Sequence, residues 1–211
     1  MRIEARDQVR PKSAFASIRR YVRPPRPIER CDLCNAALEA EHAHLVETVT
    51  GRLTCACEPC AILFGDQQPG SRYRRVPRDA RRLPDFDFPD VAWEGFSIPI
   101  DLAFFLQSTP AGRVVAFYPS PGGAVQSLVA PDAWDALVEA NPVLRRFEPD
   151  VECLLVNRVG ATRDSYRVGI DACYKLVGLV RTHWHGMTGG TEVWNEINRF
   201  FNGLGERSSH A

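Results

Sequence analysis

The sequence lacks any long apolar run. No segment approaches the roughly 18 consecutive apolar residues that a membrane-spanning helix needs, so membrane insertion is not expected. The N-terminal stretch also lacks the apolar core of a secretory signal, and it carries acidic residues early. We therefore expect a cytoplasmic location.

A net charge of either sign is missing as well. The chain has 26 basic and 26 acidic residues, and only two of the basic residues are lysine. Binding to a polyanion depends on an excess of positive charge, which this neutral chain lacks. Nucleic-acid binding is therefore less expected than binding to a protein. The charges are nevertheless segregated, with net +6 over residues 1–30 and net −5 over residues 84–101. We expect the basic residues to face an acidic protein partner or the chain's own acidic segment.

The composition is otherwise that of a globular protein. With 211 residues, 45% apolar and 25% charged, the chain is long enough for one domain and a small module. Changes in composition along the chain predict its organisation. The expected parts are a basic Pro/Arg-rich arm (1–27), a cysteine module (28–64), a loop-rich connector (65–92), an α+β domain (93–205) and a flexible tail (206–211).

Five of the seven cysteines fall within thirty residues, in a chain for which a disulfide framework is not expected. Four of them form the pattern C-x2-C-x22-C-x2-C, in which each C-x2-C pair makes a tight turn whose two sulfurs converge. Two such turns supply the tetrahedral ligands of a closed zinc site, as in a zinc ribbon. The predicted zinc ligands are Cys31, Cys34, Cys57 and Cys60.

Alternatives remain open at this site. Cys55 could replace Cys57, and His44 could supply a nitrogen ligand. Thiolates also suit rubredoxin-like iron or an iron–sulfur cluster, although neither cysteine pair is followed by glycine: Asn35 and Ala61 stand there. The two remaining cysteines, Cys153 and Cys173, are expected to be small buried apolar residues.

The C-terminal half has the hydrophobic patterns of regular elements. Strands that meet as hairpins, with helices beside them, predict an α+β fold with a mainly antiparallel sheet and about three helices. The expected elements are an edge strand (96–100), a helical turn (102–107), a hairpin (113–129), a helix (131–140), two strands (151–159 and 166–170), and helices over 171–183 and from 191 to the glycines at 203 and 205.

One further stretch could hold a ligand. His183 and His185 flank Trp184, and glycines precede Thr191, where a helix is expected to begin. A pocket with catalytic histidines is one interpretation, and a solvated turn between two helices is the more expected one. No catalytic residue is predicted. We therefore do not assign an enzymatic activity, and a protein without one is the more expected case.

Several motifs together resemble a known family. They are CDLC, HAHLV, CACEPCAILF, YRRVP, IPIDLAFF, VVAFYPSPGGA, DVECLLVNR, CYKLVGLVR and GGTEVWNEINRFF. From about Glu29 to Leu204 the chain resembles an uncharacterised, mostly actinobacterial domain family of unknown function. The resemblance implies genes that neighbour those of actinobacterial-type uptake nickel–iron hydrogenases, and metal positions at the four predicted cysteines, with His44 and Cys55 in the same motif.

The predicted function is that of a non-catalytic zinc-binding accessory protein. Its implied partner is a protein, namely a nickel–iron hydrogenase subunit or maturation factor, or a similar metalloenzyme. The first alternative is an electron-transfer protein with an iron–sulfur cluster or rubredoxin-like iron. The second is a nucleic-acid-binding zinc-ribbon protein.

Overall fold

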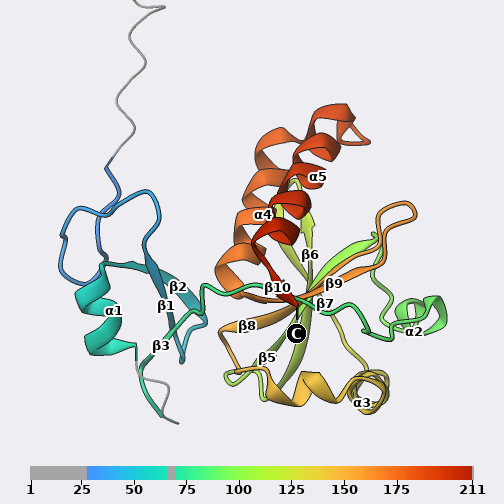
Figure 1. Ribbon diagram of the computed structural model, residues 1–211, viewed down its shortest axis with the longest axis horizontal. Coiled ribbons are helices and arrows are strands. Elements are labelled where there is room, and N and C mark those ends of the chain that lie inside the picture. The colour runs from blue at the N-terminus through green and yellow to red at the C-terminus, as the bar shows by residue number, and fades with distance from the viewer. Residues whose placement is uncertain (1–27, 66–69, 211) are drawn as a thin grey trace, which may run out of the picture.

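The computed structural model describes residues 28–65 and 70–210, so the predicted basic arm lies outside the described residues. Within them the fold is α+β, as expected, with five α-helices where about three were expected (Figure 1). The helices are α1 (Glu58–Phe64), α2 (Asp90–Glu94), α3 (Pro131–Ala140), α4 (Ile170–His183) and α5 (Gly190–Arg207), with a 3₁₀ helix η2 (Pro142–Arg146). No helix in this part of the chain is long and apolar enough to cross a bilayer.

The strands form two sheets of three and seven strands. The small sheet has the order β2-β1-β3, and the large sheet has the order β10-β4-β9-β8-β5-β6-β7. All pairs are antiparallel except β10 with β4. The strands are β1 (Ala43–Glu47), β2 (Arg52–Ala56), β3 (Tyr73–Arg75), β4 (Arg81–Arg82), β5 (Leu102–Ser108), β6 (Arg113–Ser120), β7 (Gly123–Ser127), β8 (Glu152–Asn157), β9 (Asp164–Gly169) and β10 (Ser209–His210).

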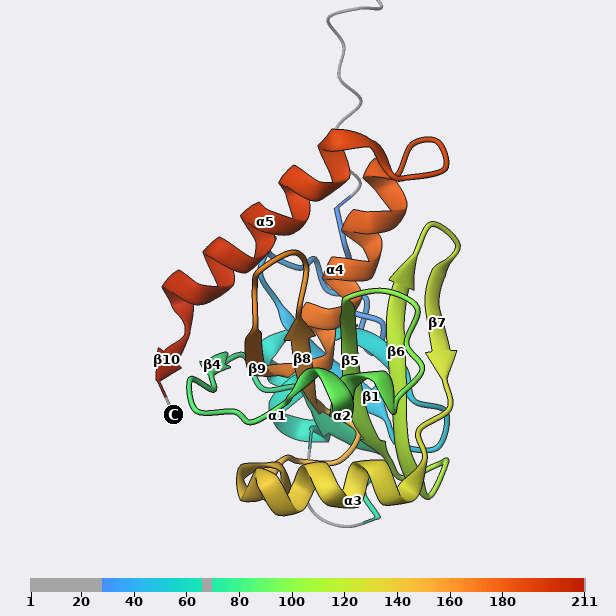
Figure 2. The same cartoon turned by 90° about the vertical axis from the view of Figure 1, so that its right-hand side faces the viewer.

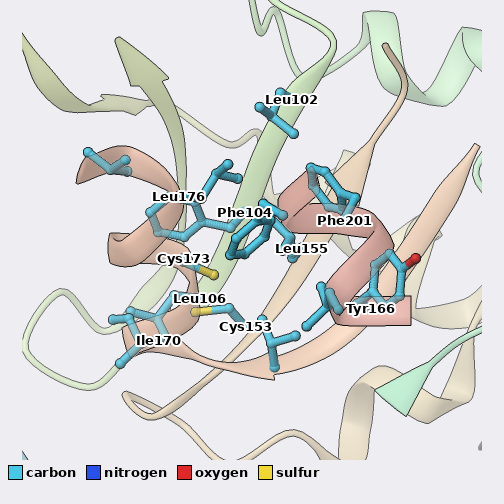
Figure 3. Close-up of a cluster of buried hydrophobic side chains, with 14 of the residues drawn as sticks. Leu102, Phe104, Leu106, Cys153, Leu155, Tyr166, Ile170, Cys173, Leu176 and Phe201 are labelled. Atoms are coloured by element: carbon cyan, nitrogen blue, oxygen red, sulfur yellow. The ribbon is translucent and has the colours of Figure 1, made fainter. Parts of the chain in front are cut away.

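The large sheet is covered on both faces, so its central strands are buried on both sides. Alternate residues of β5 enter different cores: Phe104 and Leu106 join one cluster, whereas Ala103 and Phe105 join the other. Helices α4 and α5 cover the first face, and α3 lies along the other side (Figure 2). In the first core the sulfurs of Cys153 and Cys173 point toward one another among apolar side chains (Figure 3), which confirms the expected burial of both.

Strand β5 corrects two sequence-based expectations. Residues 102–107 form a strand rather than a helical turn, and residues 96–100 form no strand. The segment Leu102–Ser108 is apolar at nearly every position, and such a run does not distinguish a buried strand from a buried helix. Phe96, expected on an edge strand, is instead buried in the second core with an exposed fraction of 1%.

The C-terminal helix is also longer than expected. Helix α5 runs through Gly203 and Gly205 and ends at Arg207, because Phe200, Phe201 and the residues around them bury its apolar face in the first core. Residues 209–210, expected in a flexible tail, pair as β10 with β4. The other predicted elements are confirmed with shifts of a few residues at their ends: the hairpin as β6–β7, the helix over 131–140, both later strands and the helix beginning near residue 171.

The acidic segment over residues 84–101 is attached to the large sheet through Arg158. The Arg158 side chain, 4% exposed, donates a hydrogen bond to the carbonyl oxygen of Phe88 at 2.6 Å and pairs with the Asp90 carboxylate. Its guanidinium carbon also lies 5.4 Å from the centre of the Trp93 ring. This segment therefore packs against the protein itself.

We expect Arg158→Met to lower the free energy of unfolding by about 2 kcal/mol. The substitution leaves the buried carbonyl of Phe88 without its charged donor and removes the stacking on Trp93. Urea unfolding followed by fluorescence checks this value. Arg145→Met, at an exposed position, is the matched control and should change the stability by less than about 0.5 kcal/mol; an equal effect of the two substitutions would contradict the account.

The cysteine module (residues 28–64) lies beside the large sheet, next to the first turn of α4 (Figure 1). The residues between its two cysteine pairs form a hairpin, β1–β2, with a turn in which the Gly51 amide donates to the carbonyl of Glu47 at 2.8 Å. Strand β3 completes the small sheet from the range predicted as a connector, and Val46 and Val76 enter the first core of the large domain. The module and the large domain therefore share apolar contacts.

Candidate metal centre

Four cysteine sulfurs converge in the module. Their Sγ atoms all lie within 4.8 Å of one another, and those of Cys34 and Cys57 are 3.6 Å apart. In a tetrahedral zinc site with Zn–S bonds of about 2.3 Å, neighbouring sulfurs are about 3.8 Å apart, so the group could hold a metal ion. The members of this group, the four-cysteine cluster, are Cys31, Cys34, Cys57 and Cys60.

The first cysteine pair lies in a tight turn that is fixed against the end of β2. The Asn35 amide donates to the carbonyl oxygen of Cys31 at 2.8 Å, and Asn35 has a left-handed φ of 63°. Asp32 bonds Cys55 twice, because its amide donates to the Cys55 carbonyl and its carboxylate accepts from the Cys55 amide. Asparagine tolerates this conformation better than most residues, so the missing glycine did not prevent the turn.

The second cysteine pair begins a helix. Cys57 precedes α1 as its N-cap, Pro59 stands in the first turn where proline is favoured, and Cys60 is the third residue of the helix. The cluster therefore combines a turn with a helix N-terminus, rather than the two similar turns expected from the sequence. Cys31 and Cys60 are buried, Cys57 is half-buried and Cys34 is exposed.

The thiols of the cluster differ in acidity. Burial acts to raise the pKa of Cys31, but hydrogen bonds from nearby backbone amides, that of Cys57 first, outweigh it and lower the pKa to about 6. Burial, together with hydrogen bonds from the neighbouring cysteines, raises the pKa of Cys60 to about 12. Four thiolates in one small volume would repel one another, so all four can ionise only beside a cation. A bound dication would supply that positive charge.

The two alternative ligands, Cys55 and His44, lie elsewhere. They belong to a second group with His42, in which the three ligand atoms lie within 4.8 Å of one another. The register explains the separation, because His44 is directly opposite Cys55 in the β1–β2 ladder and His42 precedes it by two positions. Cys57 lies beyond the end of β2, and it is Cys57 rather than Cys55 that joins the four-cysteine cluster.

The loop around His183 and His185 is a turn between α4 and α5. Both ring Nε2 atoms lie near the carboxylate of Glu192, at 3.9 and 3.8 Å, and the side chain of His185 is 70% exposed. A mostly apolar cavity of about 340 Å³ lies beside this turn, and Trp184 and Trp194 contribute to its wall, but neither histidine does. His183 and His185 therefore lie in a solvated turn between two helices, and they do not line this cavity.

A family model described as a family of unknown function (DUF5947) matches residues 30–208, which include both ligand groups. No curated protein and no solved structure matches the chain. The description of the matching family assigns it no function.

Proposed function

The chain belongs to this DUF5947 family of unknown function, and we propose that it is a non-catalytic accessory protein whose four-cysteine cluster holds one zinc ion. The ion folds the cysteine module and presents it to a protein partner. We propose a nickel–iron hydrogenase subunit, a hydrogenase maturation factor or a similar metalloenzyme as that partner.

The observation that carries the proposal is the convergence of four sulfurs on one point. Four thiolates complete the coordination of a zinc ion and leave no position for a substrate, which is typical of structural rather than catalytic zinc. The apolar cluster of the module is also small. Its buried members are two of the metal-site cysteines, three alanines and Leu45, and a core of this size needs additional stabilisation such as a metal ion.

Helix α1 supports the interaction part of the proposal. Three consecutive apolar side chains on it are exposed: Ile62 by 68%, Leu63 by 74% and Phe64 by 48%. Adjacent exposed apolar residues of this kind are unusual on a protein without a partner. They follow Cys60 closely, so metal binding would fix the helix that carries them. The hydrogenase part rests on the gene neighbourhood that the resemblance implies.

A second candidate function is electron transfer by rubredoxin-like iron in the same cluster. Two observations favour it: the left-handed conformation at Asn35, and the exposure of Cys34, which would bring the centre close to solvent and to a redox partner. Zinc and iron thiolates are distinguished by colour, because only the iron centre absorbs visible light.

Anaerobic purification, metal analysis and a visible spectrum test the two candidates together. Zinc in the four-cysteine cluster with no visible absorption is the expected result. Iron with visible absorption would replace the accessory function by electron transfer. A folded module with no metal would contradict both.

A charge on α1 is expected to weaken binding to the hydrogenase partner by at least about tenfold. Leu63→Asp places a carboxylate in an apolar contact, which costs more than about 1.4 kcal/mol. Binding of the purified full chain to a purified nickel–iron hydrogenase and to its maturation factors, measured by interferometry, checks the effect. Leu128→Asp, at an equally exposed position, is the matched control; a failure of the wild-type chain to bind any of these proteins would remove the hydrogenase proposal.

A further inference from the structure

The structure assigns a second metal site, formed by the imidazole nitrogens of His42 and His44 and the thiolate of Cys55, for a divalent transition metal ion such as zinc. We call this group the histidine cluster. It uses none of the sulfurs of the four-cysteine cluster, but it rests on the proposed function in one respect, because His44 and Cys55 lie on the strands β1 and β2 of the module that the first ion folds.

The first observation is the tautomer of His42. Its Nδ1 atom lies 2.9 Å from the carbonyl oxygen of Glu39. A carbonyl oxygen can only accept, so Nδ1 carries a hydrogen, and the neutral form of this ring presents the lone pair of Nε2. The His42 side chain is only 8% exposed, and its Nε2 atom is buried without a hydrogen-bond partner. An unpaired buried nitrogen is costly unless something binds it.

The second observation is that His44 is held in the same way. Its Nδ1 atom lies 3.0 Å from the Oδ2 atom of Asp171, in the first turn of α4. An ionised carboxylate accepts, so Nδ1 of His44 carries a hydrogen, and the neutral ring that a metal binds offers the lone pair of Nε2. A carboxylate or carbonyl that holds the far nitrogen of a histidine ring is the usual outer shell of a metal-ligating histidine. Both rings of this cluster have one.

The third observation is the position of Cys55. It is paired with His44 across the β1–β2 ladder, and the His42 and His44 ring centres are 4.7 Å apart. One ring nitrogen of each histidine and the Sγ atom of Cys55 lie within 4.8 Å of one another. Ligands of a tetrahedral zinc ion are about 3–4 Å apart, so small side-chain rotations complete the site.

The ligand set indicates the chemistry. Two neutral imidazoles and one thiolate suit zinc and neighbouring transition metals rather than calcium or magnesium. Binding releases the thiol proton of Cys55 to solvent and leaves a fourth coordination position free for water or a further ligand. A site with a free position exchanges its ion more readily than a closed site of four thiolates. The protein would therefore carry one firmly held ion and one exchangeable ion.

Metal counting on the full chain tests the second site. Native mass spectrometry of the purified wild-type chain supplied with zinc should give two ions. His42→Gln with His44→Gln, and separately Cys55→Ser, should each give one. His183→Gln with His185→Gln is the matched control and should keep two. A wild-type chain that holds a single ion under excess zinc, or a histidine-cluster variant that still holds two, would overturn the assignment.

Cobalt binding shows which of the two sites holds an ion, the histidine cluster or the four-cysteine cluster. A cobalt ion in the four-cysteine cluster has four sulfur ligands, whereas one in the histidine cluster has a single sulfur ligand. The histidine-cluster variants should therefore lose one ion and only a minor part of the sulfur-to-cobalt absorption. If a variant loses both ions because it misfolds, the number of ions on the wild-type chain shows whether the second site exists.

A gentler change tests the role of Asp171. Asp171→Asn keeps the size of the side chain but removes the carboxylate charge that polarises His44. We expect zinc affinity at the histidine cluster to fall by about 10–100-fold, with the affinity of the four-cysteine cluster unchanged. Competition with a zinc chelator measures both. An unchanged affinity at the weaker site would show that Asp171 acts only as a structural contact and would contradict the assigned outer shell.

Discussion

Cys60→Ser is expected to release the ion of the four-cysteine cluster and to unfold the cysteine module, while the large sheet stays folded. The free energy of structural zinc binding in small domains is about 10–16 kcal/mol at neutral pH, and where no site exists in the unfolded chain it is also folding free energy. The buried apolar cluster of the module consists mainly of alanines and cysteines. Its packing alone therefore cannot replace the contribution of the ion.

Hydrogen exchange read by mass spectrometry checks this result segment by segment. Amides of β1 and β2 should lose protection in Cys60→Ser, whereas amides of β5 and β8, in the centre of the large sheet, should keep it. The matched control is Cys173→Ala, which removes a buried thiol that belongs to the first core and to neither ligand group, and it should leave the metal content unchanged. Retention of both the ion and the protection in Cys60→Ser would contradict the structural role of the cluster.

Phe105→Ala is expected to lower the free energy of unfolding of the large domain by about 3–5 kcal/mol. The Phe105 side chain is 1% exposed, and its ring centre lies 5.1 Å from that of Phe96 and 5.7 Å from that of Trp134. It thus joins the acidic segment, β5 and α3 in the second core. Removing the ring leaves a cavity bounded by other rings, which cannot collapse easily.

Urea unfolding followed by tryptophan fluorescence checks the loss, because Trp93 and Trp134 both pack in this core. The expected change is a lower midpoint with an unchanged slope. Phe64→Ala removes the same group from a half-exposed position on α1 and should cost less than about 1 kcal/mol. Equal losses in the two variants would contradict the described packing.

Local patterns sufficed for the elements whose faces differ in polarity. Helix α3 was predicted with both ends in place, because Pro131 marks its start, Asn141 and Pro142 mark its end, and one face alone is apolar. The hairpin β6–β7 followed from a proline–glycine turn between two apolar runs. The same patterns failed for β5, where burial on both faces removes the alternation that identifies a strand.

The two ligand groups differ in how far the sequence reveals them. The spacing of the four-cysteine cluster is local within each pair, so the sequence alone determined that these four sulfurs would be candidates for one ion. The histidine cluster instead depends on the β1–β2 register and on Asp171, which is 127 positions from His44 along the chain. Only the tertiary structure decided that contact, because the packing of α4 against the module is set by the shared core and has no signature in the local sequence.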